Sequence, residues 1–267
     1  MASVMVAIWR CTMAEPWSEL SIDKRKQAMT SAMYGASLLT RTTVGAGHQA
    51  SDGTRLSCIF VAPEYAFAGL ASESAGKAAT QVSEAVMNGV KAAAHLLTRQ
   101  YMTILLMPGT VPYRTAIGDT AFRAHNLAFA SFQGNELCSF GKKTGVGEVS
   151  AADTTAEVPM TFQAGLGYGT FTLAGNDFGM EICKDATGTG SLPNAVDIHV
   201  VTGQGVGYDS TQGNLSIQNR ATKYLIVADA VTPAVYDFTG NQSKAVEALS
   251  IKEYTEKTKV YFYKISL

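Results

Sequence analysis

The sequence has few charged residues for its length, and the two signs nearly cancel. Only 16% of its 267 residues are Asp, Glu, Lys or Arg, whereas soluble domains average about 25%. The 21 basic and 22 acidic residues leave a formal net charge of −1. This balance argues against a nucleic-acid-binding protein, which usually has a basic excess, and against electrostatic attachment to an anionic membrane.

Long apolar runs are also missing, and none approaches the roughly 20 residues that a membrane-spanning helix needs. The first ten residues, MASVMVAIWR, lack the basic start of a signal peptide and are typical of a strand. Hydrophobic residues make up 46% of the chain, which excludes a disordered protein. We therefore expect one folded domain over residues 1–267, with no membrane contact.

Cysteine is scarce, so a disulfide framework is not expected. The four cysteines are Cys11, Cys58, Cys138 and Cys183. No Cys-x-x-Cys pair is present, and no two of the four histidines stand three or four positions apart. Because zinc sites need such pairs, we expect no metal, and the reducing cytoplasm is the expected compartment.

The common nucleotide-binding and nucleophile motifs are incomplete. Residues 203–207 read GQGVG after a predicted strand, but Tyr208 stands where the dinucleotide fingerprint needs its last glycine. Residues 141–144 read GKKT, but Glu136 occupies the place of the first glycine of a phosphate-binding loop. No Gly-x-Ser-x-Gly elbow is present. These gaps argue against a nucleotide site and a serine nucleophile.

Short apolar runs alternate with helical patterns over the first 110 residues. Strands are predicted at 4–9, 56–62 and 102–107, and helices at 23–39 and about 75–99. This order indicates an α/β layered domain.

The remainder is dominated by strand-like runs, two pairs of which are hairpins. Strands are predicted at residues 126–132, 137–140, 169–174, 178–183, 196–202, 224–230 and 260–265. A helical stretch is expected near 211–221, and the glycine-rich residues 141–169 are expected to form long loops.

Three segments end a predicted strand with a reactive side chain. Glu64 follows an apolar run and Pro63, Lys142 follows a hairpin, and Cys183 ends the strand at 178–183. Singly, each has an ordinary explanation as a solvated acid, a surface lysine or a core cysteine. Together they could perform chemistry, because a carboxylate can take a thiol proton and a lysine can stabilise an oxyanion. Only one of Lys142 and Lys143 can enter such a site, since neighbouring strand residues face opposite ways.

In order, spacing and context, these segments resemble the nitrilase, or carbon–nitrogen hydrolase, superfamily and its amidase-like branch. The Pro-Glu-Tyr at 63–65 resembles the catalytic glutamate segment, and 126–142 resembles the hairpin that ends in the catalytic lysine. The Ile-Cys-Lys-Asp at 182–185 resembles the nucleophile strand, and 219–221 resembles the Arg-Ala helix end. The resemblance extends over about 4–243.

The resemblance implies a four-layer α-β-β-α sandwich that often pairs as a homodimer. It implies hydrolysis of a small-molecule amide without any cofactor. Glu64 would be the base, Cys183 the nucleophile that forms a thioester, and Lys142 with the backbone N–H of Lys184 would hold the oxyanion.

Two further positions are candidates for substrate contact under this resemblance. They are Tyr65, next to the predicted base, and Glu148, the one nearby candidate for the second glutamate of the family. Glu148 is closer to Lys142 in the sequence than the second glutamate of the family usually is. Thr144 stands where the family commonly has histidine, and 186–190 read ATGTG where many members have Pro-Glu. The Lys-Asp at 184–185 replaces the Trp-Glu of true nitrilases, which favours amide over nitrile hydrolysis.

Three other functions remain open from the sequence. Acyl transfer to an amine could use the same triad, and the altered residues after Cys183 could belong to a catalytically silent binding protein. A cysteine–histidine hydrolase could instead use His125 or His199 as its base.

Overall fold

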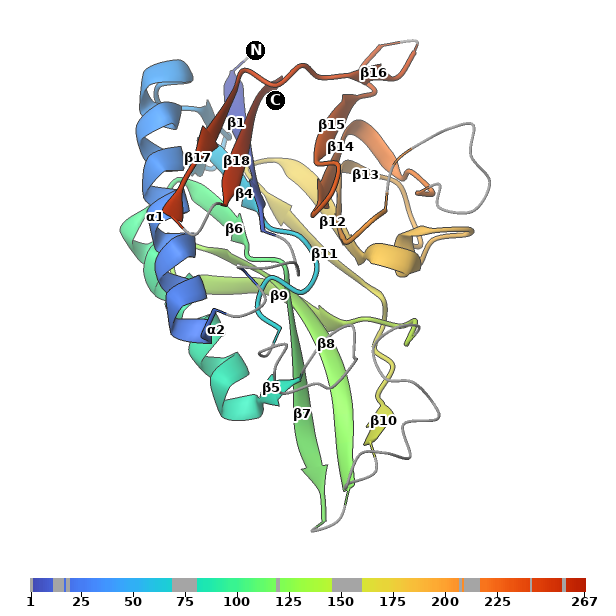
Figure 1. The fold of residues 1–267 in the computed structure, drawn as a ribbon. Helices are drawn as coiled ribbons and strands as arrows, with labels where there is room; N and C mark the ends of the chain where they lie inside the picture. The colour runs from blue at the N-terminus through green and yellow to red at the C-terminus, as the bar shows by residue number, and fades with distance from the viewer. Residues whose placement is uncertain are drawn as a thin grey trace.

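The computed structural model describes residues 2–11, 17, 20–68, 81–118, 121–145, 160–206, 208, 217–240, 242–255 and 258–267. In this part of the chain, two β-sheets pack face to face, and two α-helices cover the outer face of the first sheet (Figure 1).

The first sheet has the strand order β17-β18-β1-β4-β6-β8-β7-β5, with β9 and β10 also paired to β8. Strands β1, β4 and β6 are parallel, whereas β18 is antiparallel to β1, so the two chain ends lie together (Figure 1). Its strands are β1 Ser3–Arg10, β4 Cys58–Val61, β5 Val82–Ser83, β6 Ile104–Met107, β7 Thr110–Ile117, β8 Ala121–Phe132, β9 Asn135–Gly141, β10 Met160–Phe162, β17 Ser250–Glu253 and β18 Lys259–Ser266.

The second sheet has the order β11-β12-β13-β14-β15-β16. Its central strands β12, β13 and β14 are parallel, so their carboxyl ends meet at one edge. The strands are β11 Tyr168–Leu173, β12 Asn176–Ile182, β13 Val196–Gly203, β14 Ala221–Asp229, β15 Ala234–Asp237 and β16 Lys244–Ala245. A separate small hairpin joins β2 His48–Gln49 to β3 Arg55–Leu56.

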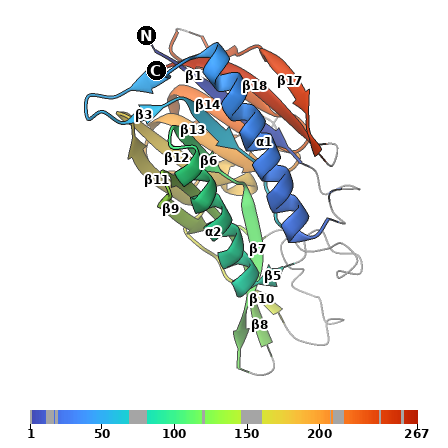
Figure 2. The same ribbon diagram turned by 90° about the vertical axis from the view of Figure 1, so that its left-hand side faces the viewer.

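Both helices begin at a serine cap. The side chain of Ser21 accepts a hydrogen bond from the backbone of α1 (Ile22–Thr43), and Ser83 does the same for α2 (Glu84–Gln100). Such caps satisfy backbone N–H groups that have no partner within the helix. The two helices lie across the same face of the first sheet (Figure 2).

The alternation of side chains along β1 shows how one strand serves two cores. Val4, Val6 and Ile8 pack between the sheets, whereas Met5 and its alternate neighbours pack against the helices. Successive strand residues point to opposite faces, and burial on both faces accounts for an uninterrupted apolar run.

The structure confirms the predicted α/β sandwich and every predicted strand, with boundaries shifted by a few residues. The second helix begins at Glu84 and not near residue 75, because Val82–Ser83 pairs with β7 and Ser83 caps the helix. Strand β7 was not predicted, and β10 lies where only loops were expected.

The fourth layer of the sandwich is not represented by an α-helix among the described residues. Residues 211–216 of the predicted helical stretch lie outside them, and residue 221 begins β14. All four cysteines are unpaired thiols. In the described part of the chain, no helix is long and apolar enough to cross a membrane.

Candidate active site

Two charged side chains form a buried ion pair where β4 and β9 end. The Nζ of Lys142 lies 2.6 Å from Oε1 of Glu64, and each side chain is only 1% exposed. Glu64 follows β4 by three residues, and Lys142 directly follows β9, whose pairing with β8 continues through a hydrogen bond from Lys142 N–H to Asn126 O of 2.8 Å. The sheet therefore joins two predicted site residues that are 78 positions apart.

Neighbouring side chains hold this pair in place. Asn126 donates from Nδ2 to Oε1 of Glu64 over 3.1 Å, and the ring of Tyr65 lies 5.6 Å from the Lys142 ammonium. Tyr65 has a left-handed backbone (φ +61°), and its N–H donates to Oγ1 of Thr110 over 2.9 Å. Asn126 was not singled out from the sequence as a site residue, although asparagine is depleted in strands, and its place in a strand-like run was the available signal.

Cys183 lies at the end of β12, as the first residue of a 3₁₀ turn, Cys183–Ala186. It is buried, and its φ of +48° is rare for any residue other than glycine. Burial and, to a smaller extent, the charge of Glu64 raise the pKa of its thiol to about 12, although the charge of Lys142 acts in the opposite direction. A hydrogen bond with Glu64 and one from the backbone N–H of Gln204 act on the same thiol. The three predicted triad residues are therefore in one place, with the thiol protonated at neutral pH.

Asp185 connects the cysteine turn to the lysine. Its Oδ2 accepts from the backbone N–H of Lys143 over 2.7 Å, and its Oδ1 accepts from that of Thr144 over 2.8 Å. One carboxylate thus fixes the chain directly after Lys142 to the turn that begins with Cys183.

Other predicted residues have different positions. Lys184 has an exposed side chain, and its carbonyl accepts hydrogen bonds from Thr187, so its role as an oxyanion donor stays a prediction. Lys143 is exposed, whereas Lys142 is buried, and Glu148 lies outside the described residues.

Both candidate histidines have other partners. Nε2 of His125 lies 3.0 Å from Oγ1 of Thr115. His199 uses Nε2 for Glu181 and Nδ1 for the backbone N–H of Arg220, so neither ring nitrogen is left to accept a thiol proton. This arrangement argues against a cysteine–histidine mechanism that uses His199.

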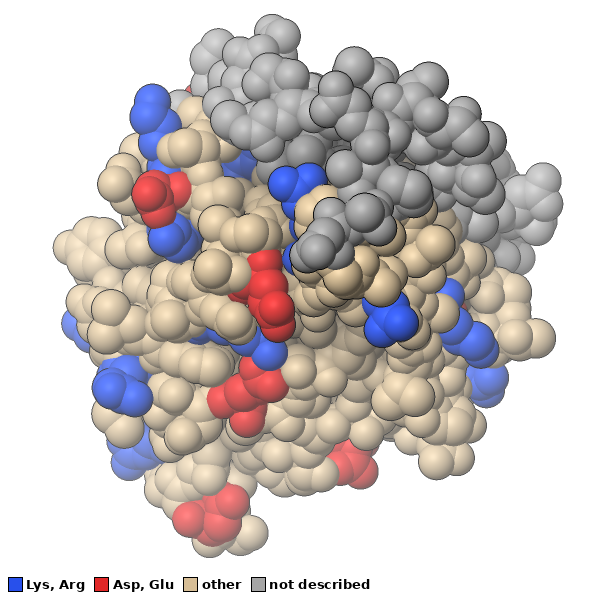
Figure 3. Space-filling model, turned by 90° about the horizontal axis from the view of Figure 1, so that it is seen from below, with Lys and Arg blue, Asp and Glu red and all other residues tan. Residues whose placement is uncertain are grey.

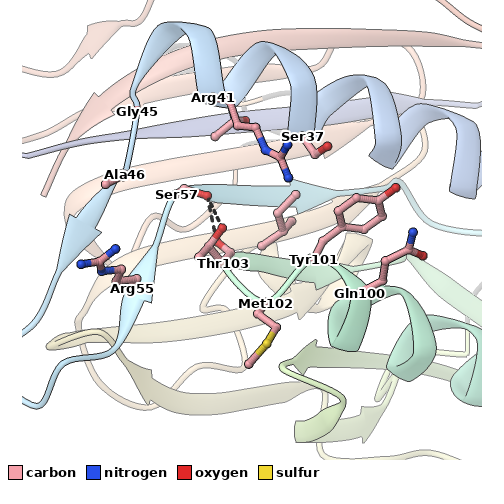
Figure 4. A pocket seen from close by; sticks show the side chains of 12 residues that line it. Ser37, Arg41, Gly45, Ala46, Arg55, Ser57, Gln100, Tyr101, Met102 and Thr103 are labelled. Carbon is pink, nitrogen blue, oxygen red and sulfur yellow. Dashed lines mark hydrogen bonds between the residues drawn. The ribbon is translucent and has the colours of Figure 1, made fainter.

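A cavity of about 330 Å³ lies away from the triad residues, between the C-terminal ends of α1 and α2 (Figure 4). Ser57 and Thr103, whose hydroxyls are 2.7 Å apart, line it just before β4 and β6 begin, whereas Glu64 follows the other end of β4. Its Arg41 stands in the last turn of α1, where a cation complements the helix dipole. This cavity is separate from the candidate active site.

Charge on the face in Figure 3 is mixed, with Lys and Arg interspersed with Asp and Glu among mostly uncharged residues. Among the described residues, no group of three or more His, Cys, Asp or Glu side chains could hold a metal ion.

No known protein-family model and no curated protein sequence matches the chain. Solved structures do match it. A cysteine variant of the nitrilase-superfamily amidase from Nesterenkonia sp. AN1 aligns with a TM-score of 0.60 and 14% identity, over 99% of this chain and 92% of the amidase. The same amidase with a glutamate and a cysteine replaced, in complex with acrylamide, aligns with a TM-score of 0.59 and 13% identity, over 98% and 90%.

A larger enzyme contains the same fold. The glutamine-dependent NAD⁺ synthetase from Acinetobacter baumannii aligns with a TM-score of 0.54 and 14% identity, over 99% of this chain and 46% of the synthetase. The chain therefore has the nitrilase-superfamily fold that its sequence motifs implied.

Proposed function

We propose that this protein belongs to the carbon–nitrogen hydrolases and cleaves the amide bond of a small molecule. The observation that carries the proposal is the buried Glu64–Lys142 pair, 2.6 Å apart, next to a protonated thiol that hydrogen-bonds to the same glutamate. The Nesterenkonia amidase supports it, because structures of that enzyme hold acrylamide and butyramide and show acrylamide added to its active-site cysteine.

In the first half of the reaction, Glu64 takes the proton from the Cys183 thiol as sulfur attacks the amide carbonyl. The negative charge passes to the carbonyl oxygen, where Lys142 and the backbone N–H of Lys184 stabilise it. The carbon–nitrogen bond then breaks, the leaving nitrogen receives the proton from Glu64, and a thioester remains on Cys183.

In the second half, Glu64 removes a proton from water, and the resulting hydroxide attacks the thioester. The carbon–sulfur bond breaks, the proton returns to Cys183, and the carboxylic acid leaves. Tyr65 supports this cycle through its contact with Lys142, and Glu148 stays a candidate for substrate contact.

The test is a panel of small aliphatic amides, beginning with acrylamide and butyramide, with ammonia and the acid product measured. Mass spectrometry should detect the acyl group on Cys183, and added amines reveal whether acyl transfer competes with hydrolysis. If no amide releases ammonia, and an amide-directed electrophile labels Cys183 no faster than the buried Cys58, the proposal is wrong and the protein is a catalytically silent binding protein.

The pH dependence tests Glu64 as the base. Because the pKa of Cys183 is raised to about 12, the wild-type rate should reach a plateau around neutral pH and show no limb near an ordinary thiol value of 9.0. In Glu64→Gln the thiolate must form without a base, so kcat/KM should be low and rise about tenfold per pH unit.

The control is the wild-type profile over about pH 5.5 to 9.5, measured with the same amide. A Glu64→Gln variant with the wild-type rate and profile would show that Glu64 is not the base. An acid limb near the free histidine value of about 6.5 in both proteins would indicate a histidine instead.

We also infer that the protein forms a dimer, as the superfamily resemblance implies. Four large apolar side chains are about half exposed: Tyr34 and Leu38 on α1, Ile251 on β17 and Leu249 just before β17. Their exposure supports an interface that is buried in solution. Sedimentation at micromolar concentration should show a species heavier than the 28.3 kDa chain, and a monomer there contradicts the inference.

A further inference from the structure

A second buried acidic side chain lies two residues before the nucleophile. Glu181 is on β12 and His199 is on the adjacent strand β13, and neither is exposed to solvent. Oε2 of Glu181 lies 2.8 Å from Nε2 of His199. Because Met180 and Ile182 pack into the core between the sheets, Glu181 points to the opposite face of the second sheet.

The hydrogen bonds of this pair determine where its proton resides. Nδ1 of His199 accepts from the backbone N–H of Arg220 over 3.2 Å, so the ring carries its proton on Nε2 and donates it to Glu181. Oε1 of Glu181 accepts from the backbone N–H groups of Ser191 and Leu192. The carboxylate is therefore matched with three donors, and the histidine with one donor and one acceptor.

These contacts close the loop that starts with the nucleophile. The loop runs over residues 183–192, and it turns at Gly188 and Gly190, whose φ angles of +65° and +68° favour glycine. Its far end returns to Glu181, which itself belongs to the strand that leads into Cys183. The Glu181 carboxylate thus ties the far end of the loop to the strand from which the loop begins.

Cys183 needs such support because of its backbone. A φ of +48° is unfavourable for cysteine, and a residue keeps a conformation of this kind only when the surrounding structure enforces it. If the loop relaxed, the thiol would move away from its hydrogen bonds with Glu64 and the N–H of Gln204.

We propose that Glu181 and His199 are positioning residues that hold Cys183 in its left-handed conformation against Glu64, by tying the end of the 183–192 loop to β12. This inference rests on the proposed role of Cys183 as the nucleophile. Neither residue is exposed to solvent, and in this proposal both act through the backbone of the loop.

The experiment measures how the alkylation rate of Cys183 by iodoacetamide depends on pH, with the Cys183 peptide quantified by mass spectrometry. The variants are Glu181→Gln and His199→Ala. In Glu181→Gln, an amide oxygen that stays on the N–H groups of Ser191 and Leu192 leaves the amide NH₂ facing the Nε2–H of His199, so two donors meet. If the histidine moves its proton to Nδ1, that N–H faces the backbone N–H of Arg220, and again two donors meet. The matched control is Thr98→Val, which removes a buried hydroxyl that lies 2.9 Å from Oγ of Ser131, outside the second sheet.

In the wild type and in Thr98→Val, we expect no inflection near 9.0, because the site raises the pKa of Cys183 to about 12. In Glu181→Gln and His199→Ala, an inflection should appear near 9.0, the value of an ordinary thiol. His199→Gln can still donate to Glu181 and should show a smaller change. With an amide substrate, kcat should fall on the order of 10²-fold, while KM changes little.

The proposal is overturned if folded Glu181→Gln and His199→Ala keep the wild-type profile, or if Thr98→Val shifts the profile equally. It is also overturned if the wild-type thiol itself titrates near 9.0, since Cys183 is then not held as described. If the two stronger variants do not fold, the profile of His199→Gln decides. The readout needs no substrate, so a wild type that cleaves no amide refutes the proposed function and leaves this test intact.

Discussion

Cys183→Ala is expected to abolish amide hydrolysis, with the rate lowered about 10⁴-fold or more, because the thioester forms on the sulfur that this change removes. The fold should survive this change. Alanine adopts the φ of +48° no more easily than cysteine does, so the backbone strain is unchanged, and one lost sulfur leaves a small gap. The free energy of unfolding should change by about 1 kcal/mol or less. Ammonia release and urea unfolding measure the two effects.

The control for this prediction is Cys138→Ala, which makes the same chemical change at a half-buried thiol 4.0 Å from the sulfur of Met180. Hydrolysis in that variant should match the wild type. If Cys183→Ala keeps the wild-type rate, Cys183 is not the nucleophile and the proposed function is wrong.

Lys142→Met should affect both activity and stability. The variant leaves the Glu64 carboxylate buried without its cation, and breaking a buried ion pair in this way costs about 3–5 kcal/mol of folding free energy. Hydrolysis should fall by about 10²–10³-fold, the usual effect of removing one donor from an oxyanion site. Steady-state kinetics and urea unfolding of the same preparation measure both quantities.

Lys143→Met is the matched control, because Lys143 is the exposed neighbour on the same chain segment. Its stability should stay within about 0.5 kcal/mol of the wild type. The double variant Glu64→Gln/Lys142→Met removes both charges, so it should regain much of the lost stability while staying inactive. A fully active Lys142→Met beside an inactive Lys143→Met would reverse the assignment of the lysine.

The elements that the sequence predicted best are those whose pattern is local. The apolar runs at β1, β4 and β6 mark buried strands, and the hairpin of β8 and β9 has a turn whose residues Gln133 and Gly134 both have positive φ. Strand β7 was not predicted, because only its first three residues, Thr110 to Pro112, are buried, and the rest are partly or fully exposed. The start of α2 was predicted too early, because the alanine-rich sequence before Ser83 continues the helical pattern, whereas the helix begins only after its cap at Ser83.

The site shows the same division. The sequence identified Glu64, Lys142 and Cys183 as reactive side chains at strand ends, and its motif order implied the nitrilase-superfamily fold. It gave no sign that Asn126 contacts Glu64, since that contact depends on β8 joining the sheet two strands from β4, the strand that leads to the glutamate.

The sequence by itself therefore determined which segments form buried strands and which side chains stand where those strands end, because apolar periodicity and turn residues act over a few neighbouring positions. The tertiary structure alone decided that Asn126 contacts Glu64, and that Glu181 meets His199 rather than solvent. Those outcomes depend on strand order and register, which are set by packing between residues far apart in the chain, where one position of slippage would turn each side chain to the other face.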